Sequence, residues 1–306
     1  MKKFFKRVLT ATLTATMIFG VTGDVAAASK VKVSTAQDTE GRMMDFSALP
    51  SYEYQEKLIY VYNNGQRIYG VAYVPKTDKK VPLVIFSHEL TFTHFTGIPY
   101  ARKLASHGVA TYVFDFRGGS VDSASDGKTT EMSVMTEISD LECVLESAKT
   151  WDFVDKDKIV LFGGSQGGFV TSVVSTRHQD EIVGEILIYP ALVVRDDVHQ
   201  TFGSKENIPD TYNYKDWLMI GRIYAEDVWD FDVYKDMKKF KKPVLLLHGD
   251  KDPIVPTEYI EKAHKNYPNS KFYLLKGGTH GFWDDEHFEI AVSYIFNFLK
   301  DIKIFE

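Results

Sequence analysis

The feature that most constrains this chain is a Gly-x-Ser-x-Gly motif at residues 163–167, set between two segments of different character. Residues 158–162 form a short apolar run typical of a strand, and residues 169–177 are compatible with a helix. A serine on such a sharp strand-to-helix turn stands clear of the sheet, because small neighbours leave room for the turn. The motif alone is common by chance, so this context carries the prediction that Ser165 is a nucleophile.

Two strand-like runs further along the chain end in residues that complete a catalytic triad. Residues 244–249 lead into a polar loop that contains Asp250 and Asp252, and a later run leads into His280. Each candidate follows the carboxyl end of a strand, where open α/β sheets place their sites. The order serine, aspartate, histidine differs from the orders of two other common triads. It predicts a nucleophile, an acid that orients the histidine, and a base.

Strands alternate with helices over most of the chain, which is typical of parallel βαβ units in the α/β class. The first two predicted strands flank Asn63-Asn64-Gly65, a hairpin signal, so an antiparallel hairpin should precede the parallel sheet. The predicted strands are 56–62, 66–74, 81–87, 110–116, 158–162, 182–189, 244–249 and 272–275, and the predicted helices are 98–107, 132–151, 169–177, 256–267 and 286–300.

The alternation stops between about residues 191 and 242, after the sixth predicted strand. This stretch carries scattered aromatic residues and is too long for a simple connection in a compact domain. We expect it to form a small helical cap over the site.

The first 28 residues have the three parts of a secretory signal peptide. Four basic residues precede an apolar stretch, residues 8–21, that is too short for a good membrane span, and three alanines at 26–28 supply a cleavage site. An uncleaved anchor is the alternative. We predict cleavage near Ala28, which leaves residues 29–306 as a secreted hydrolase-like domain with no stable membrane span.

The net charge and the counts of cysteine and histidine limit which partners and cofactors the chain is expected to bind. The formal net charge is −6, and cleavage at residue 28 would remove four basic residues and one acidic residue, leaving −9. An acidic chain without a basic block has no electrostatic footprint for nucleic acid. The single cysteine permits no internal disulfide. The histidines other than His280 show no ligand-like clustering with cysteine or carboxylates, so we expect no metal and no cofactor.

From about residue 81 onward, these motifs resemble an α/β-hydrolase of the feruloyl (cinnamoyl) esterase type, a group of small bacterial serine esterases. The resemblance implies a mostly parallel sheet with flanking helices and a cap inserted after strand 6. It also favours Asp252 over Asp250 as the acid between Ser165 and His280. The matching segments are 114–118, 125–128, 163–168, 189–191, 208–210, 242–244, 248–252 and 278–280.

The resemblance assigns the oxyanion hole to the backbone N–H groups of Leu90 and Gln166. The chain departs from the family here, because His88-Glu89-Leu90 stands where such enzymes usually have His-Gly-Phe. Glu89 restricts the backbone and brings a carboxylate near a developing negative charge. A side chain turned to solvent would do little harm, whereas one turned inward would slow catalysis.

In the cap, the resemblance assigns Asp197 and Tyr224 to the phenolic end of a hydroxycinnamoyl group. Each has a plainer interpretation: Asp197 as a helix cap and Tyr224 as packing among Trp217, Ile223 and other apolar residues of the cap.

We therefore expect a secreted serine carboxylic ester hydrolase acting on aryl, hydroxycinnamoyl or short acyl esters, with esters from plant cell walls among its small-molecule substrates. A secreted serine aminopeptidase or acylaminoacyl-peptidase-like hydrolase is the alternative, because fold and triad do not separate ester from amide cleavage. A non-catalytic binder with the same fold is a second alternative, against which the intact triad argues.

Overall fold

A single mixed sheet forms the centre of the fold. Within the described residues it has nine strands in the order β1-β11-β10-β7-β6-β4-β5-β3-β2. All neighbouring strands are parallel except the pairs β5–β3 and β3–β2. This confirms the predicted parallel sheet with a leading hairpin. The strands are β1 (Ser34–Thr35), β2 (Tyr54–Asn63), β3 (Gln66–Pro75), β4 (Val81–Ser87), β5 (Ala110–Phe114), β6 (Val154–Gly164), β7 (Gly184–Ile188), β10 (Val244–Gly249) and β11 (Ser270–Leu275).

The computed structural model describes residues 34–35 and 43–305. The predicted signal peptide, residues 1–28, lies outside these residues and stays a prediction. Within the described residues, no helix is both long and apolar enough to span a membrane.

The hairpin of β2 and β3 turns at the predicted position. Asn63 pairs with Gln66, and the two residues between them, Asn64 and Gly65, have positive φ angles of 50° and 81°. Positive φ at both positions is the requirement of a type I′ turn, which asparagine and glycine tolerate best.

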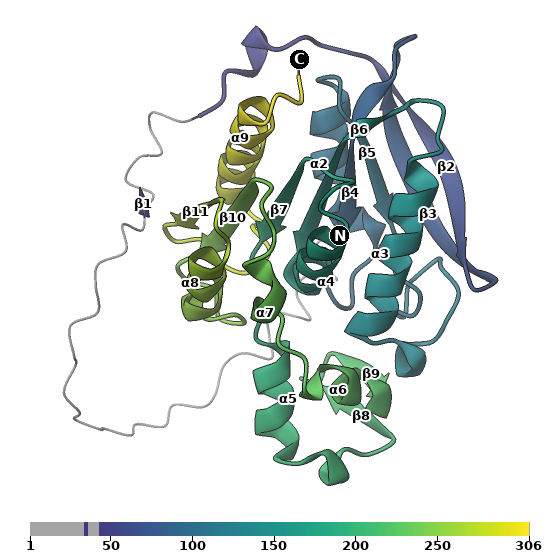
Figure 1. Cartoon of the computed structure of the whole chain (residues 1–306), viewed down its shortest axis with the longest axis vertical. Helices are drawn as coiled ribbons and strands as arrows, with labels where there is room; N and C mark the ends of the chain where they lie inside the picture. Colours follow the sequence, from purple (N-terminus) through teal and green to yellow (C-terminus); the bar gives the residue numbers. More distant parts are fainter. Residues whose placement is uncertain (1–33, 36–42, 306) are drawn as a thin grey trace. The chain divides into compact units, whose positions relative to one another are not determined.

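Helices cover both faces of the sheet, as Figure 1 shows. Alternate residues of a strand point to opposite faces, and β4 divides in this way: Leu83 and Ile85 join one apolar cluster, and Val84 and Phe86 join the other. Helices α3, α4 and α8 pack on the first cluster, and α2 and α9 on the second. Their bounds are α2 (Ile98–Ala105), α3 (Val134–Ala148), α4 (Ser165–Arg177), α8 (Thr257–Asn266) and α9 (Asp285–Asp301).

Helix α4 corrects the sequence prediction, since it begins at Ser165 and not at residue 169. Glycines disfavour helix, which is why Gly167 and Gly168 looked like part of the turn. Tertiary packing decides otherwise: a Cβ on Gly167 would lie 2.2 Å from the carbonyl oxygen of Ser87. Glycine is therefore needed to let the helix start pack directly on β4.

The stretch at 191–242 forms the expected cap, but it is not purely helical. It contains a separate two-stranded antiparallel sheet, β8–β9, which the sequence analysis did not predict. Figure 1 shows these elements gathered in the lower part of the view, beyond one end of the large sheet. They are α5 (Val194–Phe202), η6 (Lys205–Asn207), β8 (Thr211–Tyr214), β9 (Leu218–Gly221) and α6 (Arg222–Trp229). Helix α7 (Tyr234–Met237) follows them and lies nearer the large sheet, beside α4 and α8.

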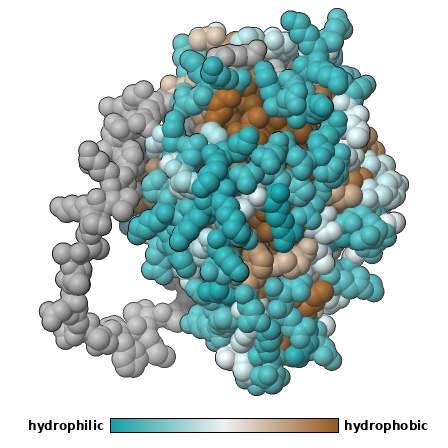
Figure 2. Space-filling model, viewed as in Figure 1, coloured by the Kyte–Doolittle hydropathy of each residue, from teal (hydrophilic) through white to brown (hydrophobic). Residues whose placement is uncertain are grey.

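Hydrophilic residues cover most of the face seen in Figure 2, and apolar residues gather there in separate areas.

The cap contacts the main domain through η5 (Thr129–Glu131), where the Thr129 hydroxyl donates to the carbonyl oxygen of Met219, 2.6 Å away.

Candidate active site

Ser165 lies on a strained turn between β6 and α4. Its φ angle of 48° falls in the left-handed region, which is costly for a residue with a side chain and is held only by the surrounding structure. A Cβ on Gly163 would lie 2.3 Å from the carbonyl oxygen of Gly167, so the turn is too tight for larger residues. The predicted nucleophile turn is therefore present in geometry as well as in sequence.

The structure brings Ser165, His280 and Asp252 together in one hydrogen-bonded chain. His280 Nε2 lies 2.9 Å from Ser165 Oγ, and His280 Nδ1 lies 2.7 Å from Asp252 Oδ2. With Nδ1–H donating to the carboxylate, Nε2 is left to accept the serine proton. The rival carboxylate, Asp250, instead accepts from the Gly277 N–H at 2.6 Å.

Asp252 is buried and held by the backbone. Its Oδ1 accepts from the N–H groups of Ile254 and Val255, at 2.8 and 3.0 Å. Burial by itself would raise the pKa of Asp252, but the hydrogen bond and charge of His280, with the Val255 N–H, hold that pKa below its usual value. The carboxylate is thus ionised and fixed in position at neutral pH.

The peptide that carries the Leu90 N–H is fixed by His88. Phe116 N–H donates to His88 Nε2 at 3.0 Å, which leaves the ring proton on Nδ1, and Nδ1–H donates to the carbonyl oxygen of Glu89 at 2.7 Å. Burial lowers the pKa of His88, so the ring stays neutral in this role. Because a trans peptide points its N–H away from its C=O, the Leu90 N–H faces away from His88. Gln166 lies in the first turn of α4, where backbone N–H groups lack helical acceptors.

Glu89 turns inward, the orientation in which its carboxylate is expected to slow catalysis. Its carboxylate is nevertheless satisfied, accepting from the hydroxyls of Thr96 at 2.7 Å and Tyr189 at 3.0 Å. The carboxylate lies beside Gly164, the residue before Ser165. A Cβ added to Gly164 would lie 2.6 Å from Glu89 Oε1. Two donors therefore hold this carboxylate, and the Tyr189 ring contacts the His280 ring at an interplanar angle of 56°, with centroids 4.9 Å apart.

The side chain of Gln166 joins the main domain to the cap. Its Nε2 donates to Glu137 Oε2 at 2.8 Å, and its Oε1 accepts from the Tyr224 hydroxyl at 2.6 Å. Burial raises the pKa of Glu137 to about 8, against the smaller opposing effect of the hydrogen bond from Gln166. The predicted cap tyrosine thus lies in the site, but its hydroxyl is already bound to the side chain of Gln166, the residue that follows Ser165.

A small pocket of about 30 Å³ opens between Ser165 and the cap. The carboxylate of Asp197 reaches it from α5, accepts from the Tyr214 hydroxyl at 3.1 Å, and pairs with Lys215 at 2.8 Å. Asp197 lies inside α5 and makes no capping bond, which rules out its plainer interpretation. The pocket is lined by Leu90, Ser165, Gln166, Ala191, Val193, Val194, Asp197, Tyr214, Lys215, Trp217, Tyr224 and Ile254.

Similarity to known proteins identifies the family to which the chain belongs. Residues 99–303, more than half of the chain, match the prolyl oligopeptidase family, Peptidase_S9. The chain belongs to this family. It is similar to the solved structure of Est1E from Butyrivibrio proteoclasticus with bound ferulic acid, at 28% identity and a TM-score of 0.72, covering 79% of this chain and 98% of Est1E. The protein is therefore a serine hydrolase of the α/β-hydrolase superfamily.

Two curated relatives match this chain over only part of their own length. An uncharacterized membrane protein of Saccharomyces cerevisiae is 24% identical over 186 residues, 58% of this chain and 59% of that protein. Human dipeptidyl peptidase 8 is 27% identical over 147 residues, 43% of this chain and 16% of that protein. The chain thus spans less than two thirds of the length of both relatives.

The hairpin that supplies Tyr214 and Lys215 to the pocket was not predicted from the sequence. The structure shows partial alternation of burial along these strands, with Tyr214, Leu218 and Ile220 buried and Asn213 and Met219 exposed. The turn lacks glycine, yet Lys215 and Asp216 both adopt positive φ, at 50° and 59°. Without the usual glycine or asparagine, the turn was not recognised.

One histidine contradicts the expectation that none clusters with carboxylates. His178, Glu146 and Glu181 have ligand atoms within 4.8 Å of one another, because the ends of α3 and α4 meet there. The ammonium group of Lys149 already pairs with both carboxylates, so it offsets their charge.

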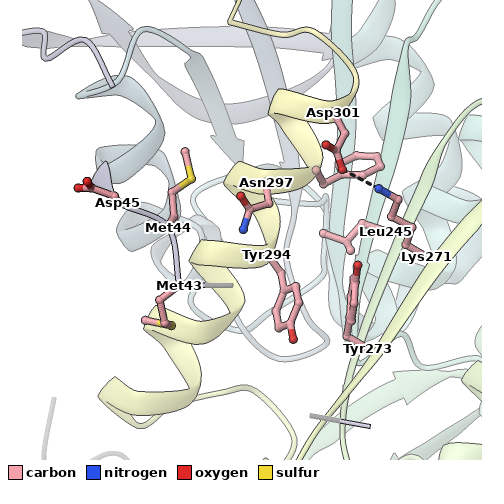
Figure 3. Close-up of a pocket in the computed structure, with 10 residues that line it drawn as sticks. Met43, Met44, Asp45, Leu245, Lys271, Tyr273, Tyr294, Asn297 and Asp301 are labelled. Atoms are coloured by element: carbon pink, nitrogen blue, oxygen red, sulfur yellow. Dashed lines mark hydrogen bonds and ion pairs between the residues drawn. The ribbon is translucent and has the colours of Figure 1, made fainter. Parts of the chain in front are cut away.

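A larger hollow of about 370 Å³ lies between α9 and the β10–β11 side of the sheet (Figure 3). Its walls include the stacked rings of Tyr273 and Tyr294, whose centroids are 4.2 Å apart, and the ion pair of Lys271 with Asp301. It shares no lining residue with the triad or the cap pocket. Its lining also includes Met43, Met44 and Asp45.

Proposed function

We propose that this protein is a serine carboxylic ester hydrolase that acts through an acyl-enzyme on Ser165. The observation that carries the proposal is the unbroken hydrogen-bonded chain from Ser165 Oγ through His280 to Asp252. This is the arrangement in which a base removes the serine proton and a fixed carboxylate stabilises the resulting imidazolium.

In the first half of the reaction, Ser165 Oγ bonds to the ester carbonyl carbon as His280 Nε2 takes its proton. The bond from that carbon to the alkoxy oxygen then breaks, and His280 returns the proton to the departing alcohol. In the second half, water gives a proton to His280 and its oxygen bonds to the same carbon. The carboxylic acid leaves as Ser165 regains its hydrogen.

The negative charge that develops on the carbonyl oxygen needs donors already in place. The backbone N–H groups of Leu90 and Gln166 fill this role in the proposal. Support for it comes from the bond between His88 and the Glu89 carbonyl, which holds the Leu90 peptide in one orientation.

We propose aryl, hydroxycinnamoyl or short acyl esters as substrates, including those of plant cell walls. The pocket supports a hydroxylated acyl group, because Asp197 can accept a hydrogen bond from a substrate hydroxyl there. Its small free volume fits a short acyl chain as it stands. A hydroxycinnamoyl group would require cap side chains such as Lys215 or Trp217 to move. Est1E, with ferulic acid bound in its solved structure, adds support from a relative.

The family match favours a second candidate, cleavage of aminoacyl or peptide amides, because the family is named for prolyl oligopeptidase. The test is to assay the purified chain, residues 29–306, on p-nitrophenyl esters, methyl ferulate and aminoacyl-p-nitroanilides. Ester cleavage without anilide cleavage is expected. Faster cleavage of the anilides would favour the peptidase, and no activity on any of them would contradict a hydrolase.

We also propose that the protein is secreted after cleavage near Ala28, on the strength of the sequence of residues 1–28 alone. The N-terminus of the exported protein, measured by mass spectrometry, should be Ser29. An exported or membrane-bound chain that retains residue 1 would contradict this proposal.

A further inference from the structure

An ester bound at Ser165 has three parts that must point in different directions: the carbonyl oxygen, the acyl group and the leaving alcohol. This inference rests on the proposed ester hydrolysis. In the proposed reaction, the carbonyl oxygen faces the Leu90 and Gln166 N–H groups, and the acyl group enters the cap pocket, which Ser165 lines. The leaving oxygen must face His280, because Nε2, 2.9 Å from Ser165 Oγ, delivers its proton. The lining of the cap pocket does not include His280, so the alcohol half of the ester lies elsewhere.

Two aromatic rings lie on the loops that carry His280 and Leu90, and the Trp283 ring packs against Gly281, the neighbour of His280. Trp283 follows His280 by three residues, and Phe92 follows Leu90 by two; their ring centroids lie 5.5 Å apart at an interplanar angle of 32°. Trp283 keeps 44% of its surface exposed. The pair therefore connects the histidine loop to the loop that carries the proposed oxyanion donor.

The position of the Trp283 side chain depends on the glycine at residue 281. A Cβ on Gly281, the residue next to His280, would lie 2.0 Å from the indole Nε1. Gly281 also has a φ of 98°, a conformation that favours glycine. The indole can thus lie directly over the chain beside His280 only because residue 281 has no side chain.

We propose that Phe92 and Trp283 form a leaving-group subsite that binds esters whose alcohol carries a ring, either an aryl group or a sugar. A single exposed tryptophan needs no explanation. Two neighbouring rings, tilted by 32° and held between the histidine and oxyanion loops, offer apolar surface against which another ring can pack. The cap then selects the acyl half of the ester and this pair selects the alcohol half.

The test keeps the acyl group constant and varies the alcohol: methyl butyrate, benzyl butyrate and 6-O-butyrylglucose. For Trp283→Ala, the ratio of kcat/KM for a ring ester to that for the methyl ester should fall about 3- to 10-fold, the scale of one aromatic stacking contact. The benzyl ester reports an aryl preference and the glucose ester a sugar preference, and a fall in either ratio supports the subsite. Trp283→Phe should keep most of the preference.

The matched control is Trp217→Ala, since Trp217 is 42% exposed but lines the acyl pocket. It should change all three esters by a similar factor and leave the ratios alone. Phe92→Leu provides a second variant if Trp283→Ala fails to fold, and it should lower the same ratios. Unchanged ratios in folded variants would overturn the subsite while wild-type cleavage upheld the proposed function. Inactivity of the wild-type protein on all three esters would overturn both.

Discussion

The triad and the cap pocket meet at Ser165 but are built in different ways. Asp252 is fixed by two backbone N–H groups at the end of a strand in the nine-stranded sheet. Asp197 is held by the side chains of Tyr214, on β8, and Lys215, in the turn after it, and β8 and β9 pair only with each other within the described residues. Backbone support fixes geometry, whereas side-chain support on a separate hairpin can change without disturbing the sheet. We therefore expect changes in the triad to abolish chemistry and changes in the cap to alter selectivity.

The largest expected effect belongs to the triad. Ser165→Ala should lower kcat about 10⁶-fold on every ester, the usual cost of losing a triad nucleophile. Far-ultraviolet circular dichroism and thermal unfolding should match the wild type. Substantial turnover by the purified variant would place the nucleophile elsewhere.

The next effect separates the two aspartates of one loop. Asp252→Asn should lower kcat by about 10⁴-fold, because an amide no longer holds His280 with its proton on Nδ1. Asp250→Asn is the matched control, since that carboxylate caps the Gly277 N–H. If both variants lose activity equally in steady-state assays, the assignment of the acid is wrong.

Glu137 tests the link between the two regions. Its pKa of about 8 lies above the ordinary value of 4.5, so the folded state holds a proton that the unfolded state releases. This contribution to stability is fully present below about pH 4.5 and is lost as the pH rises through 8.

Glu137→Gln removes that titration but keeps an acceptor for Gln166. Relative to the variant, the wild type should lose roughly 2–4 kcal/mol of unfolding free energy between pH 5 and pH 8. Urea unfolding at several pH values measures this difference. Parallel pH profiles for the two proteins would show that Glu137 is ionised in the folded state.

The smallest expected effect lies in the cap. Asp197→Ala should lower kcat/KM for methyl ferulate about 10-fold, the scale of one buried hydrogen bond, and change p-nitrophenyl acetate little. Asp196→Ala is the matched control, because Asp196 accepts from the Tyr259 hydroxyl and does not line the pocket. Equal losses on both substrates would assign Asp197 a structural role and remove the contrast with the triad.

The sequence by itself determined the parts that depend on local pattern. The β2–β3 hairpin, the parallel strands and the order of Ser165, Asp252 and His280 were all readable, because turn chemistry and apolar periodicity act over a few residues. The carboxyl ends of parallel strands lie at one edge of a sheet. Strand prediction alone was therefore enough to bring the three triad candidates near one another.

Only the tertiary structure decided how side chains far apart in sequence meet. Glu89 turns inward because Tyr189, 100 residues away, donates to it, and Gln166 binds Tyr224 across 58 residues. The start of α4 at Ser165 and the hairpin that supplies Lys215 also overrode local propensity. These contacts form when the packed core brings distant polar groups out of water together, since a buried polar group must find a partner wherever the fold supplies one. No local pattern encodes that choice.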